Sequence, residues 1–428
     1  MARKMKDSGI EWIGEIPTDF SLYKLKYLLS SPLCYGANES GTLYSDILPR
    51  YIRITDISPN GTLKNSGMLS LDESSAQNYM LHEGDILFAR SGATVGKSFI
   101  YHNYYGRAAY AGYLIKASFN RLVLPEFVYY YTCSSAYEIW KNSIFIQSTI
   151  QNIGADRYSN LPISVPNSID KQLRIVRYLN NFCSKFDAII YNLQTSIEDY
   201  KKLKQAIITQ AVTKGVRGER EMKDSGVEWI GEIPAEWKIQ RFARVAEVKS
   251  NLVSPDNYLE YPQISPENIE KDSGKLLLPC KTVGEVGIIS GNHLFYKGQI
   301  LYSKIRPKLN KVCIAPFDGL CSADMYPIET NNDTRYIMYC ILSNGFLQQV
   351  SMITEDRVKM PKINQVELSK ILVAMPCFLA EQKEIANCLD AKCAEIDGLI
   401  AKKEQLVKEL ESYKKSLIYE VVTGKREV

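Results

Sequence analysis

The chain contains one long helical pattern twice, and this repeat constrains the fold more than any other feature. Residues 166–179, PNSIDKQLRIVRYL, correspond without a gap to residues 376–389, PCFLAEQKEIANCL, 210 positions later. In both copies apolar residues then recur at steps of three and four, the spacing of a coiled-coil seam. We expect each copy to be one helix of roughly 65 Å at 1.5 Å per residue. Helices of that length with a narrow apolar stripe need a partner, so we expect the two to pair; two separate surface helices are the alternative.

The predicted helix-pair seam is apolar or aromatic at the positions that define it. These positions are Phe186, Ile189, Leu193, Ile197 and Tyr200 in the first copy, and Ile396, Leu399, Val407, Leu410 and Tyr413 in the second. Lys403 interrupts the pattern once.

A second repeat leads into the region before each helix. Residues 5–17, MKDSGIEWIGEIP, return as residues 222–234 with one substitution, which indicates an internal duplication. The segments that follow have diverged but contain β-type runs such as 51–55 and 85–89. Residues 84–97 align without a gap with residues 298–311.

These repeats predict the domain organisation. We expect globular domains at 1–165 and 216–375, and helical regions at 166–215 and 376–428. The expected fold class is α/β (α+β), with two duplicated globular domains separated by two long antiparallel coiled-coil helices in a pseudo-two-fold arrangement. Similar frames with divergent middles suggest two copies of one reader for two different targets; neutral drift after duplication is the alternative.

Composition excludes some classes of protein. The net charge is only +4, so any basic surface must be local. The ten cysteines form no C-x-x-C pair and share no spacing with the three histidines, so we expect no metal site. The first residues have no apolar core for a signal peptide, and no run approaches a membrane span. We therefore expect a cytoplasmic protein without a membrane partner.

One motif resembles a phosphate-binding loop. Residues 92–98, GATVGKS, approach G-x-x-x-x-G-K-[ST], but Ser91 stands where the first glycine belongs. The continuation FIYHNYY reads as a strand, whereas the motif must open a helix. Nucleotide hydrolysis is therefore not expected.

Basic, hydroxyl and amide side chains instead suggest a nucleic-acid surface. They gather on the glycine-rich turn after residue 89 and on the corresponding turn after residue 303. Arginine can pair bidentately with guanine, and Asn or Gln with adenine. The candidate DNA contacts are Arg53, Thr55, Arg90, Ser91, Thr94, Lys97, Gln147, Gln151, Asn152, Arg157, Ser265, Asn268, Lys304, Arg306, Lys308, Lys311, Arg357 and Lys359. Solvated charges and loop-capping side chains are the alternatives.

No catalytic constellation is found in the sequence. It has no H-E-x-x-H, no G-x-S-x-G and no Asn/Asp-Pro-Pro-aromatic tetrapeptide of the kind that amino-methyltransferases use. Three scattered histidines offer few general bases. We expect no catalytic residues in this chain.

Over essentially its whole length the chain resembles the specificity (S) subunit of Type I restriction-modification systems. The resemblance rests on the two WIGEIP lead-ins, on GDILFARSG at 84–92 followed by Val95-Gly-Lys, and on the 376–389 segment. It implies two target recognition domains, each reading one half of an interrupted site in double-stranded DNA. The chain would catalyse nothing and hold no cofactor. Two modification (methyltransferase) subunits would bring S-adenosylmethionine for adenine methylation, and restriction/translocase subunits would bring ATP and Mg.

The alternative from another class is a non-enzymatic helical adaptor joining protein partners. Salt dependence separates the two, because a DNA reader releases counterions and loses affinity steeply with salt. Within the resemblance one difference stands out: Lys171-Gln172 replaces the Glu381-Gln382 of the second copy. We expect this difference to affect partner contact and not the fold.

Overall fold

The chain forms two compact units, each with a mixed α/β domain and part of both long helices. The computed structural model describes residues 3–58, 61–92, 94–145, 151–357 and 360–428. Unit 1 comprises residues 1–193 with 405–428, and unit 2 comprises residues 194–404. Both chain ends therefore belong to unit 1. The domain boundaries predicted at 165, 215 and 375, and the pseudo-two-fold arrangement, stay predictions.

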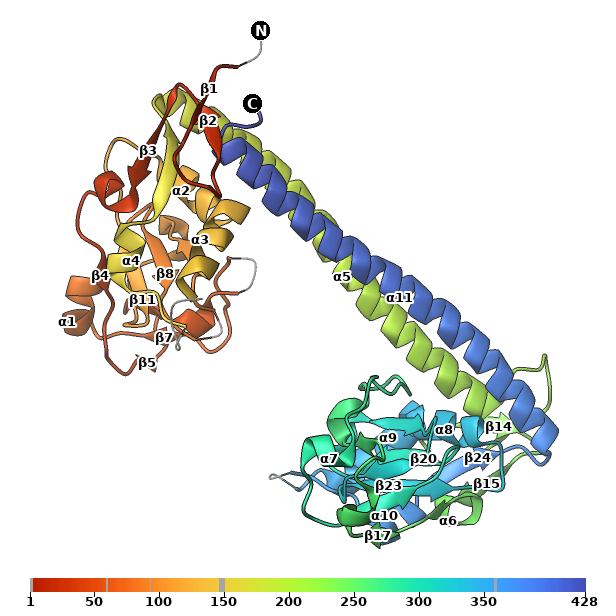
Figure 1. The fold of residues 1–428 in the computed structure, drawn as a ribbon. Helices are drawn as coiled ribbons and strands as arrows, with labels where there is room; N and C mark the ends of the chain where they lie inside the picture. The colour runs from red at the N-terminus through yellow and green to blue at the C-terminus, as the bar shows by residue number, and fades with distance from the viewer. Residues whose placement is uncertain (1–2, 59–60, 93, 146–150, 358–359) are drawn as a thin grey trace. The chain divides into compact units, whose positions relative to one another are not determined.

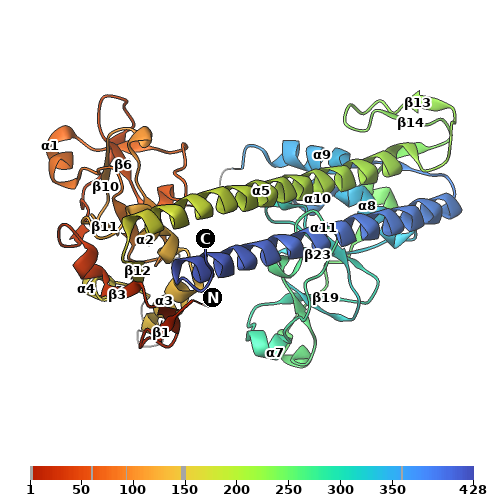
Figure 2. The same ribbon diagram turned by 90° about the horizontal axis from the view of Figure 1, so that it is seen from above.

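The two predicted long helices are confirmed as α5 (Ile169–Lys214) and α11 (Leu379–Val422). Within each unit a stretch of α5 runs antiparallel to a stretch of α11 (Figure 1, Figure 2). In unit 1 the Nζ of Lys414 lies 2.5 Å from a carboxylate oxygen of Asp187. Each helix is too polar overall to be stable alone, so the shared apolar stripe holds the pair together.

In unit 2 the seam has a small buried cluster. Ile197, Ile396 and Ile400 pack together, with Tyr200 against them. Lys403, expected to break the seam, places its Nζ 5.5 Å from the ring centroid of Tyr200. The lysine therefore covers the aromatic ring instead of opening the interface.

The seam differs from the prediction at Ile189. This residue is 47% exposed, whereas its neighbour Ile190 is half-buried. Tyr413 is 53% exposed, but its ring centroid lies 5.6 Å from that of Phe186 on the other helix, so it still contributes to the seam. Leu399 is half-buried beside the buried Ile400. The physical reason is that the covered positions of α5 follow alternating steps of three and four residues. These positions are 183, 186, 190, 193, 197, 200 and 204, and residue 189 is not one of them.

The other predicted seam positions are covered. Phe186, Leu193, Tyr200 and Leu410 are half-buried, and Ile197, Ile396 and Val407 are buried.

Unit 1 has two four-stranded sheets, a two-stranded pair and a hairpin. The main sheet is antiparallel, in the order β4 (Cys34–Tyr35), β11 (Leu114–Ala117), β8 (Ile86–Ala89), β9 (Ser98–Ile100). The second is β10 (Ala108–Tyr110), β6 (Arg50–Ile52), β7 (Leu69–Ser70), β5 (Thr42–Leu43), and β12 (Pro162–Pro166) pairs with β3 (Phe20–Lys24). The lead-in hairpin is β1 (Met5–Asp7) with β2 (Glu15–Pro17). The helices are η1 (Leu25–Leu28), η2 (Ile54–Asp56), α1 (Glu73–Ala76), η3 (Gln77–Tyr79), η4 (Asn103–Tyr105), α2 (Pro125–Thr132), α3 (Ser135–Phe145) and α4 (Ala155–Ser159).

Unit 2 repeats most of this plan. Its main sheet is β16 (Glu247–Val248), β23 (Met325–Glu329), β20 (Ile300–Ser303), β21 (Val312–Ile314). The second is β17 (Leu252–Val253), β19 (Asn292–Phe295), β22 (Gly319–Cys321), β18 (Gln263–Ile264), and β15 (Lys238–Arg241) pairs with β24 (Leu372–Met375). The lead-in hairpin is β13 (Met222–Asp224) with β14 (Glu232–Pro234). The helices are α6 (Phe242–Val245), η5 (Pro255–Tyr258), η6 (Pro266–Asn268), α7 (Val283–Val286), η7 (Pro307–Leu309), α8 (Thr334–Leu342), α9 (Asn344–Thr354) and α10 (Gln365–Ser369).

The aligned segments 84–97 and 298–311 occupy the same place in the two main sheets. Strands β8 and β20 are buried on both faces, because alternate residues of each strand pack into two different apolar clusters. Each pairs with the next strand, β9 or β21, and with β11 or β23. Strand β9 and not a helix follows Lys97, as the sequence predicts, but the strand ends at Ile100 and η4 follows it, so the predicted strand over 99–105 is too long.

One strand prediction is wrong at its end. The run 51–55 is strand only to Ile52, and η2 follows it. Asp56 accepts hydrogen bonds from the backbone N and from the side chain of Arg53, which stops the strand and starts the short helix.

The chain ends are held together in unit 1. The guanidinium of Arg3 donates to the carbonyl of Gly424 at 2.9 Å, and the Tyr419 hydroxyl donates to the carbonyl of Ile13 at 3.1 Å. The end of α11 thereby packs on the first lead-in (Figure 1). Across the described ranges, no helix combines the length and apolarity needed to cross a membrane.

Candidate nucleic-acid interface

In unit 1 three segments meet where β8 ends, at Arg90. Its backbone N donates to the carbonyl of Tyr113 at 3.1 Å, and its carbonyl accepts from the N of Ile153 at 2.9 Å. The next residue, Ser91, forms a β-bridge with Asn152. We call this place the strand-exit position of unit 1.

The side chain of Arg90 lies between two tyrosine rings. Its guanidinium carbon is 5.0 Å from the ring centroid of Tyr35 and 5.9 Å from that of Tyr113. Tyr35 is fixed in turn, because its hydroxyl accepts from the backbone N of Ala155 at 3.0 Å. Cation–π contacts of this kind hold a guanidinium plane without using its donors.

Arg90 has no carboxylate partner among the described residues, whereas eight other arginines of the chain have one. Its Nε is buried and makes no hydrogen bond with the part of the chain that the structure describes. The two terminal nitrogens keep their access to solvent. A rigid fork with free donors is what recognition of a base edge or a phosphate requires.

Unit 2 has the same backbone frame with different side chains. The N of Lys304 donates to the carbonyl of Asp324 at 3.0 Å, and its carbonyl accepts from the N of Ile363 at 3.0 Å. The Nζ of Lys304 lies 5.3 Å from the ring centroid of Tyr326. Lys304 therefore stands where unit 1 has Arg90, and Asp324 stands where it has Tyr113. Asp324 is paired with Lys362 at 3.0 Å.

The predicted basic turn of unit 2 follows Lys304 and has a strained backbone. Arg306 has φ 45° and Asn310 has φ 41°, a left-handed conformation that non-glycine residues seldom adopt. The N of Arg306 is held by the carbonyl of Pro361 at 2.8 Å. Arg306 and Lys308 are exposed, so the turn presents two cations to solvent. Lys308 also lines a hollow of about 460 Å³ beside Trp229.

Three candidates serve as caps at equivalent places in the two units. Arg53 makes two side-chain hydrogen bonds to the carboxylate of Asp56, at 2.8 and 3.1 Å, ahead of η2. Ser265 donates to the Oδ1 of Asn268 at 2.9 Å, ahead of η6. In the structure these side chains take part in capping the short helices.

Two further candidates hold loops. The Nζ of Lys311 is half-buried and donates to the carbonyl of Pro266 at 2.7 Å. Arg357 pairs with Glu367, with one N–O distance of 3.2 Å, and this hydrogen bond lowers the pKa of the carboxyl group. These contacts occupy the cations within unit 2.

The remaining candidates divide by exposure. Thr55, Gln151, Asn152 and Arg157 are exposed, and Ser91, Thr94 and Lys97 are half-buried. Gln147 and Lys359 lie outside the described residues. A DNA contact by any candidate stays a prediction.

The glutamines near the start of α5 and α11, Gln172 and Gln382, are buried and hydrogen-bonded within the chain. The Nε2 of Gln172, which is fully buried, donates to the carbonyls of Leu122 and Pro166, and its Oε1 accepts from the N of Leu124. In the same way Gln382 accepts from the N of Asp333 at 3.0 Å. Each glutamine ties its long helix to the segment that leads into a domain helix.

The Lys171/Glu381 difference was interpreted as a matter of partner contact, and the structure corrects this for Glu381. The Glu381 side chain is 4% exposed and accepts from Arg220 at 2.7 Å and from the indole N–H of Trp237 at 3.3 Å. At the equivalent place Lys171 pairs with Asp19 and lies over the ring of Phe20. The difference follows from the change of Phe20 to Trp237, because only the indole needs an acceptor.

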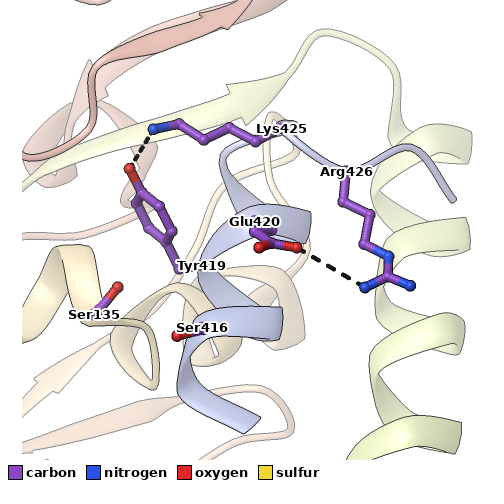
Figure 3. Close-up of a pocket in the computed structure, with 6 residues that line it drawn as sticks. All are labelled: Ser135, Ser416, Tyr419, Glu420, Lys425 and Arg426. Atoms are coloured by element: carbon purple, nitrogen blue, oxygen red, sulfur yellow. Dashed lines mark hydrogen bonds and ion pairs between the residues drawn. The ribbon is translucent and has the colours of Figure 1, made fainter. Parts of the chain in front are cut away.

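A hollow of about 740 Å³ lies at the end of α11 in unit 1 (Figure 3). It is lined by Ser135, Ser416, Tyr419, Glu420, Lys425 and Arg426. Lys425 is bonded to the Tyr419 hydroxyl and Arg426 is paired with Glu420, as the dashed lines show. The two groups that could act as bases are engaged elsewhere, Lys425 with Tyr419 and Glu420 with Arg426, and among the described contacts neither serine is hydrogen-bonded to them.

Metal binding is not supported either. Within the described ranges no three His, Cys, Asp or Glu side chains are grouped so as to hold a metal ion.

Sequence reasoning missed the two tyrosines around Arg90 and the Asp324–Lys362 pair. Tyr35, Arg90 and Tyr113 come from three separate segments, which meet only through pairing in the sheet. The signal available was the strand alignment itself, because residues that flank β11 and β23 must lie beside the ends of β8 and β20.

These observations define a class of protein: two copies of one recognition frame, carrying different polar side chains at the same backbone position, each packed on a pair of long helices. The family described as the Type I restriction modification DNA specificity domain matches residues 44–199 and 234–409. The chain belongs to this family, whose members are non-catalytic specificity subunits.

Individual relatives agree with this assignment. The chain is 33% identical over 293 residues to the Type I restriction enzyme EcoDI specificity subunit of Escherichia coli, a match that covers 65% of each chain. It is 25% identical over 435 residues to the putative type I restriction enzyme MjaX specificity subunit of Methanocaldococcus jannaschii, covering 96% of this chain and 95% of that one. The fold is also similar to that of a chain in a solved structure described as the structural basis underlying complex assembly and conformational transition of the type I R-M system. The two chains superpose with a TM-score of 0.68 at 13% identity, and the match covers 96% of this chain and 99% of the other.

Proposed function

We propose that this chain is the DNA-specificity subunit of a Type I restriction-modification system and reads an interrupted site in double-stranded DNA. One globular domain, residues 1–165, would read one half of the site, and the other, residues 216–375, would read the second half. The observation that carries the proposal is the strand-exit position, where one backbone frame presents Arg90 in unit 1 and Lys304 in unit 2. A pair of readers with a shared scaffold and different side chains is suited to an asymmetric, two-part target.

We also propose partners for the chain. Two modification subunits would methylate adenine with S-adenosylmethionine, and restriction/translocase subunits would use ATP and Mg. Family membership supports this, and so do the relatives, which are named as specificity subunits of type I restriction enzymes. The chain's own contribution would be to hold the partners at the recognised sequence.

Replacing one reader tests the proposal. Residues 18–160 would be exchanged for the corresponding arm of a relative with a different target, and methylated sites would be mapped in cells that carry the partner subunits. We expect one half of the recognised sequence to change and the other half to stay. A simultaneous change in both halves would show that the two domains do not read independently.

The adaptor alternative predicts a different response to salt. A DNA reader that neutralises several phosphates loses affinity in proportion to a power of the salt concentration. DNA affinity of the chain assembled with modification subunits, measured between 50 and 200 mM salt (about the range in which such losses are large), should fall steeply. A flat response, with no preference for the methylated sequence, would favour the adaptor.

A further inference from the structure

We propose that Arg90, clamped between Tyr35 and Tyr113, reads a guanine in the major groove of the half-site recognised by unit 1. This inference rests on the proposed function and deepens it, because it names the base that one reader requires. No equivalent requirement should come from the strand-exit position of unit 2.

Few hydrogen-bond donors of Arg90 remain free. Its Nε is buried and its carbonyl and backbone N are used by Ile153 and Tyr113, so only the two terminal nitrogens can reach a ligand. Two parallel N–H donors match the O6 and N7 acceptors on the major-groove edge of guanine. Adenine presents a donor at the position of O6, and so it cannot accept both bonds.

The tyrosine rings also position the guanidinium of Arg90. A phosphate accepts donors from many directions, whereas a base edge requires the guanidinium to lie in one plane. Contacts with rings at 5.0 and 5.9 Å limit the positions open to the guanidinium before DNA arrives. Tyr35 is itself fixed by the hydrogen bond to Ala155. Preorganisation of this kind lowers the ordering cost of a long side chain on binding.

The charge of Arg90 also leaves it available for a ligand. Among the described residues no carboxylate neutralises Arg90, although its unit contains Arg53 and Arg107, each paired with an acid. The buried Nε without a hydrogen bond costs free energy, while the terminal nitrogens stay free to bind a ligand. At the same place unit 2 carries Lys304, a single ammonium group, beside an aspartate that is already paired. A lysine lacks the planar fork, so the two readers differ in chemistry at one shared position.

The experiment uses the full chain assembled with its modification subunits. The recognised sequence is first mapped from methylated genomic sites, and arm replacement assigns one half to unit 1. Duplexes are then made in which each guanine of that half is changed to another base pair or to 7-deazaguanine, which lacks the N7 acceptor. Affinity is measured for the wild type, Arg90→Ala, Arg90→Lys and Arg107→Ala, the last being a matched loss of an exposed arginine from the same unit.

We expect one guanine at which the wild type discriminates by about 5- to 150-fold against other base pairs. Arg90→Ala should bind all base pairs at that position alike and keep its preferences elsewhere. The 7-deazaguanine duplex should weaken the wild type and leave Arg90→Ala unaffected. Relative to Arg90→Ala, Arg90→Lys should recover most of the affinity for DNA but little of the discrimination between base pairs. Arg107→Ala should discriminate between base pairs like the wild type.

Other outcomes separate this inference from the proposed function. If Arg90→Ala weakens binding equally on all sequences and 7-deazaguanine has no effect, Arg90 contacts a phosphate and the inference is overturned, while the proposed function stands. If the wild type shows no sequence preference at all, the proposed function itself fails. Should Arg90→Ala not fold by circular dichroism, Tyr113→Ala replaces it. Tyr113→Ala keeps the backbone carbonyl of residue 113 that accepts from the N of Arg90. It should lose discrimination at the same guanine, and unchanged discrimination would show that the Tyr113 ring does not position Arg90.

Discussion

Replacing Glu381 by alanine should destabilise unit 2 by about 3 kcal/mol, because it breaks a buried ion pair that also satisfies an indole N–H. The Glu381 carboxylate is 4% exposed, and its partner Arg220 is 13% exposed. Alanine leaves the 2.7 Å bond from Arg220 and the 3.3 Å bond from Trp237 without an acceptor. Breaking a buried pair by removing one partner costs about 3–5 kcal/mol in proteins generally. We take the lower end, because Arg220 keeps its second contact with Glu236.

The chain offers a matched control one helical turn away. Glu384 pairs with Arg217 at 2.7 Å, but these side chains are 46% and 49% exposed. Such a surface pair is worth about 0–1 kcal/mol and weakens further in salt. Glu384→Ala should therefore change the free energy of unfolding by less than about 1 kcal/mol.

Tryptophan fluorescence during urea denaturation provides the assay. The chain has four tryptophans, and Trp12 and Trp140 belong to unit 1. Replacing both by phenylalanine leaves Trp229 and Trp237 as reporters of unit 2. The reasoning would be refuted if Glu381→Ala and Glu384→Ala shifted the transition of unit 2 equally, since burial would then not decide the cost.

Three further predictions follow from the helix pair and its attachments. Gln382→Ala should cost about 1 kcal/mol in urea unfolding, because it removes the acceptor of the partly buried backbone N–H of Asp333; a cost equal to that of an exposed glutamine would contradict this. Asp397→Ala should destabilise the protein more than Lys204→Met. The loss of Asp397 leaves the 8%-exposed Lys204 without its carboxylate partner, whereas a methionine at 204 fits the apolar seam. The reverse order in thermal unfolding would argue against the Lys204–Asp397 ion pair. Inserting four residues near both Ile197 and Val407 should lengthen the helices by roughly 6 Å. At about 3.4 Å per base pair this adds one or two base pairs to the unread gap of the methylated site, and an unchanged gap with intact activity would make the helices mere connectors.

The sequence was a good guide wherever local pattern decides structure. The two helices were predictable because apolar periodicity is a property of neighbouring residues, and their error at Ile189 is a shift of one residue within the correct period. The correspondence of β8 with β20 was predictable because the aligned segments have no gap. The strand predicted over 51–55 was too long, because hydrogen bonds from Arg53 to Asp56 end the strand and begin η2.

The candidate site was harder, because it depends on contacts between distant segments. Arg90 was identified from its residue type and its place on a turn, but the rings that orient it come from positions 35 and 113. Lys311 was a candidate DNA contact because of its positive charge. In the structure its Nζ donates a hydrogen bond to the carbonyl of Pro266 instead. Composition shows that a cation is present, and only the fold shows whether its donors are already used.

The central claim is that the two domains read two separated blocks of one DNA site. Single-molecule sequencing of methylated bases in cells that express the chain with its modification subunits tests this most directly. The account predicts one motif made of two short fixed blocks with a constant unread gap between them, present only when the chain is expressed. A single uninterrupted block, or a methylation pattern that is the same without the chain, would contradict it.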